Sequence, residues 1–168
     1  MMRPPLIRDT EIFYSTALRA RWPHALAREW FESYPELFEE QDLALTVTQP
    51  DKHFFEWLAA VCLFHREGVH ALVEKYGFAN HPRKVRLVDE LLGSRAEVVR
   101  GLYSQHGVQP PDLLVFAPDM SRYWFAEAKG PDDRVRDSQE TSHRILQDAL
   151  GVEIEVIRFV PNPTPRPH

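Results

Sequence analysis

The chain has 168 residues, of which 43% are hydrophobic, and 20 lysines and arginines against 25 aspartates and glutamates give it a formal net charge of −5. This composition excludes a disordered chain, and because no run approaches about 18 uninterrupted apolar residues, it also excludes a membrane-spanning helix. The single cysteine, Cys62, excludes an internal disulfide and a cysteine-rich zinc site. The N-terminus lacks the apolar run of a secretory signal, so we expect a cytoplasmic protein with one main core.

The first half of the chain has a helical pattern. Residues 10–22 form one periodic segment, and a second helix is expected over residues 23–33 because it begins with a proline. A longer helix is expected over residues 53–76, where apolar residues recur at helical spacing and Gly68 weakens the middle. We therefore interpret residues 1–50 as a helical N-terminal extension.

Beyond these segments the pattern changes from helix to strand. Helices are expected over residues 82–92 and 94–105. Short apolar and aromatic runs follow at residues 113–116 and 123–126, and the turn formers Pro118-Asp119 join them. These runs predict a β-hairpin.

The last part of the chain predicts a helix over residues 137–150 and a strand over residues 152–159. The order hairpin, helix, strand indicates an α/β core with a short mixed sheet over residues 51–160. The alternating prolines of residues 161–168 predict a flexible tail.

The predicted hairpin brings two carboxylates opposite each other. The position numbers of Asp112 and Glu127 sum to 239, so these residues pair directly if the turn is centred between Asp119 and Met120. Opposed residues have Cβ atoms about 5 Å apart, and two carboxylates at that distance repel unless a positive charge lies between them. A divalent cation meets this need, and Mg²⁺ is typically held by one or two carboxylates together with water and phosphate oxygens.

Other polar side chains are expected near this pair. Lys129 lies two residues beyond Glu127 and so projects from the same face of the strand, where it can act on a water or a phosphate. Gln139 lies seven residues before Leu146, so its amide is directed toward the sheet. Glu56 interrupts an apolar helix face, where a carboxylate is costly unless it is paired or bound to metal. Glu67, eleven residues later on the same face, is the competing choice.

Two basic clusters are candidates for nucleic-acid contacts. The first consists of Arg83, Lys84 and Arg86, and the second, beside the predicted site, of Arg134 and Arg136. Both can contact phosphates and both can form solvated faces, and a phosphate contact is favoured for Arg134 because it lies beside the motif. The histidines have no metal-ligand spacing, and we interpret His65, His70 and His143 as surface or rim residues.

Taken together, the motifs resemble those of the VRR-NUC (virus-type replication-repair nuclease) family of the PD-(D/E)xK nuclease superfamily. The resemblance covers residues 108–160, and it is carried by Pro111-Asp112, by the run from Glu127-Ala128-Lys129 through Gly130-Pro131 to Asp133-Arg134, and by Gln139. Weaker similarity extends upstream to Glu56, Ala60, Phe64 and Gly68. The sequence departs from the pattern at Ser142, near where family members often carry an aromatic residue.

This resemblance implies a restriction-endonuclease-like core that uses Mg²⁺ or Mn²⁺. It implies Asp112, Glu127 and the Ala128 carbonyl as metal ligands, with Glu56 assisting and Lys129 acting on the nucleophilic water. It also implies an endonuclease of branched DNA such as Holliday junctions, in replication or repair, and stand-alone members of the family are associated with homodimers. Replication or repair proteins are then the expected protein partners.

Two hypotheses follow from the sequence. The leading one is a metal-dependent nuclease that hydrolyses phosphodiester bonds of structured DNA. The alternative is a non-catalytic nucleic-acid-binding or protein-interaction module on the same fold, and an RNA-directed nuclease would share every site residue with the leading hypothesis. The intact set of Asp112, Glu127 and Lys129 favours an enzyme, because a degraded site would have lost one of them.

Overall fold

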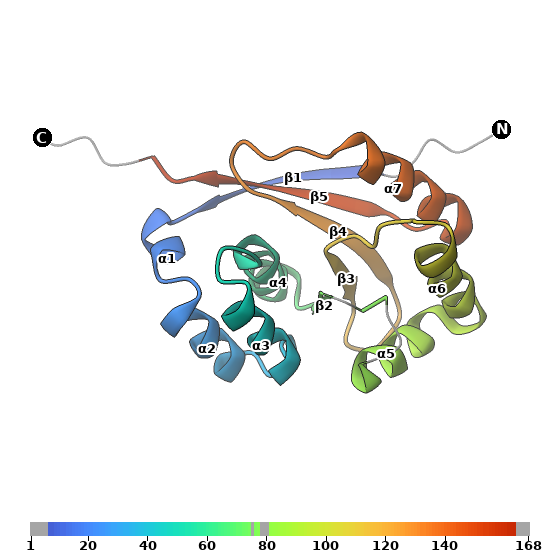
Figure 1. Cartoon of the computed structure of the whole chain (residues 1–168), viewed down its shortest axis with the longest axis horizontal. Helices are drawn as coiled ribbons and strands as arrows, with labels where there is room; N and C mark the ends of the chain where they lie inside the picture. The colour runs from blue at the N-terminus through green and yellow to red at the C-terminus, as the bar shows by residue number, and fades with distance from the viewer. Residues whose placement is uncertain (1–6, 75, 78–80, 164–168) are drawn as a thin grey trace, which may run out of the picture.

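A mixed β-sheet with helices on both faces forms the centre of the computed structural model, which describes residues 7–74, 76–77 and 81–163 (Figure 1). In the described part of the chain the sheet has five strands, in the order β1 (Ile7–Tyr14), β5 (Ile154–Pro161), β4 (Tyr123–Lys129), β3 (Leu113–Phe116) and β2 (His70–Val73). Strand β5 runs parallel to β1 and β4, whereas β3 is antiparallel to β2 and β4. This architecture confirms the expected α/β class.

The hairpin has the register that the sequence predicts. Leu113 pairs with Ala126 and Phe116 pairs with Tyr123, so the position numbers of all partners sum to 239. Continued by one residue, this register brings Asp112 opposite Glu127. Strand β4 lies in the middle of the sheet and is buried from its second residue to its last, which makes it a rigid base for polar side chains at its end.

Helices α4 (Phe54–Glu67) and α7 (Asp137–Leu150) cover opposite faces of the sheet, below and above it in Figure 1. The ring of Phe55 on α4 stacks on Phe159 of β5, with ring centroids 5.5 Å apart. On the other face, Gln139 of α7 accepts a hydrogen bond from Lys129 of β4. Because successive strand residues alternate between faces, the even-numbered residues of β4 face α4 and the odd-numbered ones face α7.

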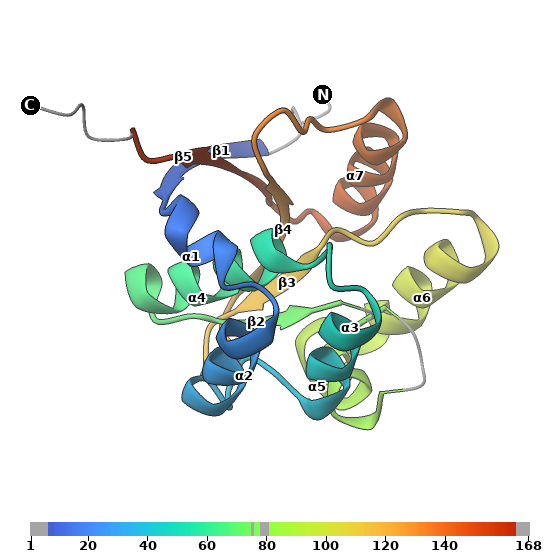
Figure 2. The same cartoon turned by 60° about the vertical axis from the view of Figure 1, so that its left-hand side comes forward.

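Three N-terminal helices lie on the α4 side of the sheet: α1 (Thr16–Ala20), α2 (His24–Ser33) and α3 (Glu40–Thr48) (Figures 1 and 2). Aromatic side chains attach this segment to α4. The ring of Phe38 stacks on the fully buried Trp57 at 3.8 Å between centroids, and Trp22 packs edge-on against Trp57 at 5.3 Å. Each such aromatic pair adds about 0.5–1.5 kcal/mol beyond the burial of its area.

The helices between β2 and β3 follow the prediction closely. Helix α5 spans Pro82–Leu92 as expected, and a short 3₁₀ segment η1 (Gly93–Arg95) leads into α6 (Ala96–Gln105). Gly93, at a φ of 58°, ends α5 because this conformation is costly for residues with a side chain. The predicted helix over 137–150 has the bounds of α7, and the last strand ends at residue 161 instead of 159.

Two helix predictions were wrong. Residues 10–14 belong to strand β1, and the residues after Gly68 form β2 instead of continuing the helix to residue 76. Gly68 has a φ of 67° and ends α4. The segment before residue 50 is thus not wholly helical, because β1 joins the central sheet by pairing with β5. Of the predicted tail, residues 164–168 lie outside the described residues.

No helix within residues 7–74, 76–77 and 81–163 has the length and apolar character that crossing a membrane requires.

Candidate active site

Asp112 and Glu127 meet at the point where β4 leaves the hairpin. The Oδ2 atom of Asp112 accepts a hydrogen bond from the backbone N–H of Ala128 at 2.9 Å, which ties the residue before β3 to the end of β4. Glu127 is 2% exposed and lies on the face of β4 that α7 covers. The hairpin register brings these two carboxylates together, because Asp112 and Glu127 are the next opposed residues after Leu113 and Ala126.

The electrostatics of this pair favour a cation. Burial, and then the charge of Glu127, raise the pKa of Asp112 well above its usual range. Burial also raises the pKa of Glu127, against the lowering effects of its hydrogen bonding with Asp112 and of the Lys129 charge. The Oε2 atom of Glu127 is buried and has no hydrogen-bond donor among the described residues. A buried carboxylate oxygen without a donor beside a second carboxylate suits a hard divalent cation, so these residues fit Mg²⁺ or Mn²⁺.

Lys129 is held at the same place by α7. Its Nζ atom donates to Oε1 of Gln139 at 2.9 Å and lies 3.9 Å from Oδ2 of Asp133. The same Gln139 oxygen accepts the backbone N–H of Arg136, so the amide is fixed from two sides. Lys129 is only 5% exposed. The structure therefore brings Lys129 and Gln139 together beside Glu127, in the arrangement that the sequence predicts.

His143 is a member of this site that the sequence interpretation missed. Its Nε2 atom lies 3.0 Å from Oε1 of Glu127, and the residue is only 3% exposed, so the prediction of a surface or rim residue was wrong. His143 thus holds one oxygen of Glu127 and leaves Oε2 for another ligand. Its position four residues after Gln139 on the same helix face was the only signal in the sequence.

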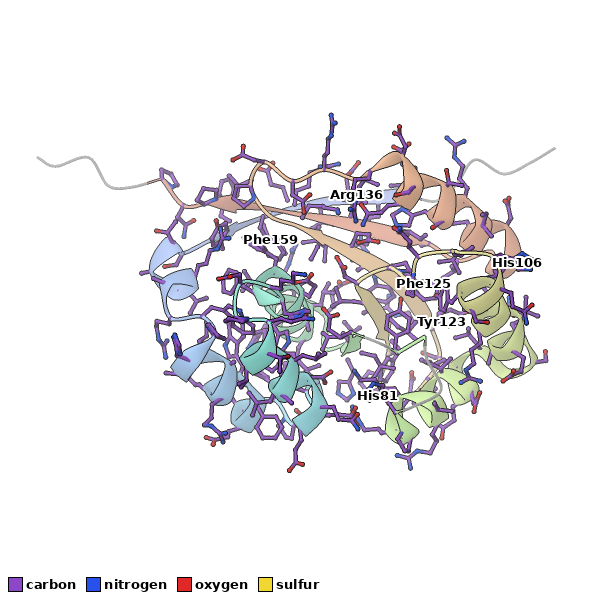
Figure 3. All side chains as sticks on the ribbon, in the orientation of Figure 1. His81, His106, Tyr123, Phe125, Arg136 and Phe159 are labelled. Atoms are coloured by element: carbon purple, nitrogen blue, oxygen red, sulfur yellow. The ribbon has the colours of Figure 1, made fainter. Side chains whose placement is uncertain are left out.

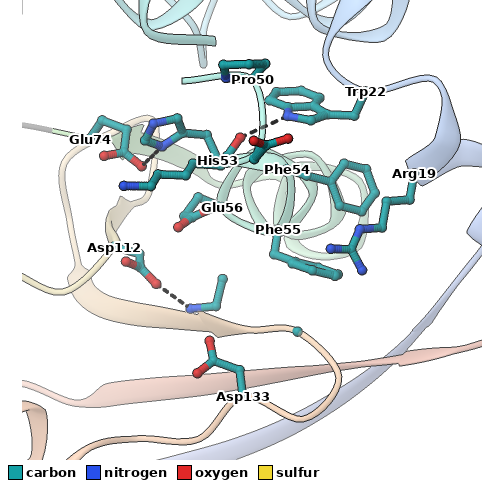
Figure 4. A pocket seen from close by; sticks show the side chains of 14 residues that line it. Arg19, Trp22, Pro50, His53, Phe54, Phe55, Glu56, Glu74, Asp112 and Asp133 are labelled. Carbon is teal, nitrogen blue, oxygen red and sulfur yellow. Dashed lines mark hydrogen bonds and ion pairs between the residues drawn. The ribbon is translucent and has the colours of Figure 1, made fainter. Parts of the chain in front are cut away.

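Glu56 reaches the site from α4 across a cleft of about 500 Å³ (Figure 4). Its carboxylate points into the same space as that of Asp112, and both residues line the cleft together with Ala128 and Asp133. Glu67 lies at the far end of α4, 3.9 Å from Arg8. The geometry thus associates Glu56, and not Glu67, with the carboxylate pair.

His53 and Glu74 also line this cleft, and the sequence interpretation missed both. His53 precedes α4, and its Nδ1 atom lies 2.7 Å from Oε1 of Glu74, just after β2. Nothing in the sequence signals this contact, because it joins residues 21 positions apart through a strand that was predicted as helix.

The structure separates the predicted nucleic-acid contacts. Lys84 is only 1% exposed and its Nζ atom bonds to Asp42 at 2.7 Å, so it cannot contact a phosphate and is withdrawn from that set. Arg83 donates to the Glu36 carbonyl. The side chains of Arg86, Arg134 and Arg136 are exposed, and Figure 3 labels Arg136 at the start of α7.

Ser142, where the sequence departs from the resemblance, is also accounted for. Its hydroxyl accepts the backbone N–H of Gln109 at 2.9 Å, and the residue is 4% exposed. The Ser142 side chain therefore holds the loop that leads to Asp112 in place.

Glu56 gives the metal-free protein a distinctive pH dependence. Burial, then the charges of Asp112 and Glu74, raise the pKa of Glu56 to about 7. A raised carboxyl pKa favours the folded state while the group is protonated, and this advantage is lost as pH rises through the folded-state pKa. Glu56→Gln stays neutral, so in chelator its stability relative to wild type should rise by about 1–3 kcal/mol between about pH 5 and pH 8.

Urea unfolding at several pH values measures this difference. Glu67→Gln, at the other end of the same helix, is the matched control and should show no such relative gain. Parallel stability curves for wild type and Glu56→Gln would contradict a repulsive carboxylate cluster.

Gly130 is where β4 ends against α4. A Cβ added there would lie 2.4 Å from Cε2 of Phe55, whose ring is already packed on Tyr14 and Phe159. Gly130→Ala should therefore lower stability by about 1–3 kcal/mol and reduce activity by displacing the chain next to Lys129. Thermal unfolding measures the first effect, with Gly101→Ala, where a Cβ meets nothing within 4 Å, as the control.

Comparison with known protein families agrees with this geometry. A family model described as VRR-NUC domain matches residues 58–161, a range that contains the hairpin, α7 and β5 and begins just after Glu56. No curated protein matches the chain closely enough to be compared. Because the matched range covers more than half of the sequence and includes Asp112, Glu127 and Lys129, the chain belongs to the VRR-NUC family, which is a nuclease-type family.

Proposed function

We propose that this protein is a metal-dependent nuclease that hydrolyses phosphodiester bonds of structured or branched DNA, including Holliday junctions. The observation that carries the proposal is the convergence of Asp112, Glu127 and Lys129 at the end of β4, where a buried Glu127 oxygen has no donor among the described residues. An ion pair formed only for stability would have used that oxygen.

Asp112, Glu127 and the Ala128 carbonyl would hold the ion. Bound Mg²⁺ or Mn²⁺ would supply Lewis-acid activation of water and neutralise charge on the phosphate. The protein positions these ligands rigidly: Asp112 is tied to the Ala128 amide, and Glu127 is held by His143. Little reorganisation is then needed when substrate enters.

Lys129 is the cation that we assign to the chemical step, because it lies two residues after Glu127 on the same face of β4. Gln139 holds its ammonium group on the face of β4 that also carries Glu127. From there it can donate a hydrogen bond to the attacking water or to a phosphate oxygen and stabilise the negative charge that grows during in-line attack. Arg134 and Arg136, exposed just beyond β4, extend positive charge along the path that a phosphate backbone would follow.

The proposal includes a local and salt-sensitive binding mode, because the net charge of −5 opposes any general attraction to DNA. Arg19 and Lys52, which line the cleft, are further cations available to phosphates.

A homodimer, replication or repair partner proteins and a cytoplasmic location stay predictions.

The test is cleavage of labelled four-way junction, flap, duplex DNA, single-stranded DNA and RNA with Mg²⁺, Mn²⁺ or EDTA. Cutting that requires the metal is expected, and Lys129→Ala should reduce it by about a hundredfold or more. Arg28→Ala, which removes a cation from the exposed side of α2, is the control and should cut like wild type.

The outcomes separate the alternatives. If only RNA is cut, the protein is an RNA-directed nuclease with the same site residues. Binding of junctions without any cutting would overturn the nuclease and favour a binding module on the same fold. Full activity of Lys129→Ala would remove that residue from the catalytic set.

A further inference from the structure

Three side chains on the α4 side of the cleft form a cluster outside the strand motif. His53, Glu56 and Glu74 each offer a ligand atom, and these atoms all lie within 4.8 Å of one another. The residues come from the N-terminal end of α4 and from the end of β2, and their side chains converge in Figure 4 above Asp112. We name this group the histidine–glutamate cluster.

The fold holds the cluster in place before any ligand arrives. His53 has a φ of 74° and Glu74 a φ of 51°, and the His53 Nδ1 atom lies 2.7 Å from Glu74 Oε1. The buried Lys84 ammonium donates to the carbonyls of Val73 and Glu74 at 2.6 and 2.7 Å, which secures the end of β2. Ligands that are already positioned lose little entropy when they bind an ion.

The charges in the cleft are unbalanced toward the negative. Glu56, Glu74, Asp112 and Asp133 all line it, and no described side chain forms an ion pair or a hydrogen bond with the Glu56 carboxylate. Arg19, one of the cations at the rim, instead lies over the Phe55 ring, 4.8 Å from its centroid. Glu74 is paired with His53, so an ion held by Asp112 and Glu127 alone would leave Glu56 as the carboxylate without a partner among the described side chains.

We propose that His53, Glu56 and Glu74 bind a divalent cation of their own, next to the site formed by Asp112 and Glu127. The cation takes the place of the direct hydrogen bond between His53 Nδ1 and Glu74 Oε1. One imidazole nitrogen with two carboxylates suits Mn²⁺ and the later first-row metals better than Mg²⁺, which prefers an all-oxygen environment. A role for this ion in cleavage rests on the proposed nuclease function, whereas its binding does not.

The experiment is a titration of the metal-free full chain with Mn²⁺, in which the electron paramagnetic resonance signal reports the free ion. Wild type is expected to bind two ions per chain. His53→Gly should bind the second ion at least about tenfold more weakly, and glycine adopts the φ of 74° without strain, so the variant keeps the backbone at the start of α4. Glu74→Gln should have the same effect, and it keeps the size of the side chain.

Two further variants serve as controls in the Mn²⁺ titration. Glu127→Gln should weaken the other ion and leave the one at the histidine–glutamate cluster. His24→Ala removes an exposed histidine from the first turn of α2 and should bind Mn²⁺ like wild type. Excess Mg²⁺ should displace Mn²⁺ from the Asp112–Glu127 site first, and circular dichroism confirms that each variant is folded.

A wild-type chain that binds a single ion, lost in Glu127→Gln, would overturn the proposal, and so would identical isotherms for wild type, His53→Gly and Glu74→Gln. The proposed function is tested separately by cleavage. If nothing is cut but His53→Gly and Glu74→Gln each lose an ion, the metal site stands and the nuclease falls. If DNA is cut and neither variant changes Mn²⁺ binding, the nuclease stands and this site falls.

Discussion

Asp112→Asn is expected to lower the cleavage rate by about a thousandfold or more while making the metal-free protein more stable. The two effects have one cause. Asp112 is half-buried beside Glu127, and desolvation together with the charge of Glu127 raises its pKa well above the usual range. Asparagine keeps the shape and can still accept the Ala128 N–H through its amide oxygen, but it removes a charged ligand and relieves the repulsion.

Single-turnover cleavage with saturating Mg²⁺ and thermal unfolding in EDTA measure the two effects on the same preparations. Asp119→Asn is the matched control, because Asp119 lies exposed in the hairpin turn and accepts the N–H of Ser121, far from the cleft. It should leave both quantities close to wild type. Undiminished cutting by Asp112→Asn would remove this residue from the metal ligands.

Lys84→Met is expected to cost about 3–5 kcal/mol of unfolding free energy, the largest stability effect that we anticipate. Lys84 is 1% exposed, and its ammonium bonds to Asp42 Oδ1 and to the carbonyls of Val73 and Glu74. Burial raises the pKa of Asp42 against the lowering effect of Lys84. Without the lysine, the buried Oδ1 atom of Asp42 and two backbone carbonyls lose their donor.

Urea denaturation measures this cost, and the double variant Asp42→Leu/Lys84→Met tests its origin. When both charges are replaced by apolar groups of similar volume, much of the lost stability should return, because the uncompensated charge is gone. Arg86→Met, which removes an exposed cation from the same helix, should change stability by less than about 0.5 kcal/mol. A loss below about 1 kcal/mol in Lys84→Met would contradict the buried pair.

The burial of Lys84 shows why a cluster of basic residues in a sequence is not by itself evidence of a nucleic-acid contact. Arg83, Lys84 and Arg86 are close neighbours along the chain, but successive residues of a helix point in different directions. In the structure Lys84 points inward, Arg83 contacts the Glu36 carbonyl and Arg86 points to solvent. Which residue turns inward depends on Asp42, a residue 42 positions earlier in the chain.

The hairpin and the helix after it were predictable because their interactions are short-range. The turn formers at Pro118-Asp119 set the centre of the hairpin, and the pairing of Asp112 with Glu127 follows from that centre alone. The helix Asp137–Leu150 ends at Gly151, whose φ of 63° stops it. The helical period places Gln139 on the face that packs against the sheet, where it accepts a hydrogen bond from Lys129.

Strands β1 and β2 could not be predicted because their structure depends on distant partners. Seven of the eight residues of β1 are exposed or half-exposed, so the segment lacks the strict alternation of a half-buried strand. It is extended because it pairs with β5, whose residues come about 147 positions later. Strand β2 has four residues, and it is a strand because β3 binds it.

The sequence by itself determined where the proposed catalytic residues lie: Asp112, Glu127, Lys129 and Gln139 fall within 28 positions, and the turn and helix rules that order them act over a few residues. Only the tertiary structure decided what surrounds them. His143, His53 and Glu74 enter the site, and Lys84 leaves the surface, through contacts between elements that the chain brings together only when the sheet and the helices pack. Burial and the charges of neighbours then set the pKa of Glu56, and neither quantity is a property of local sequence.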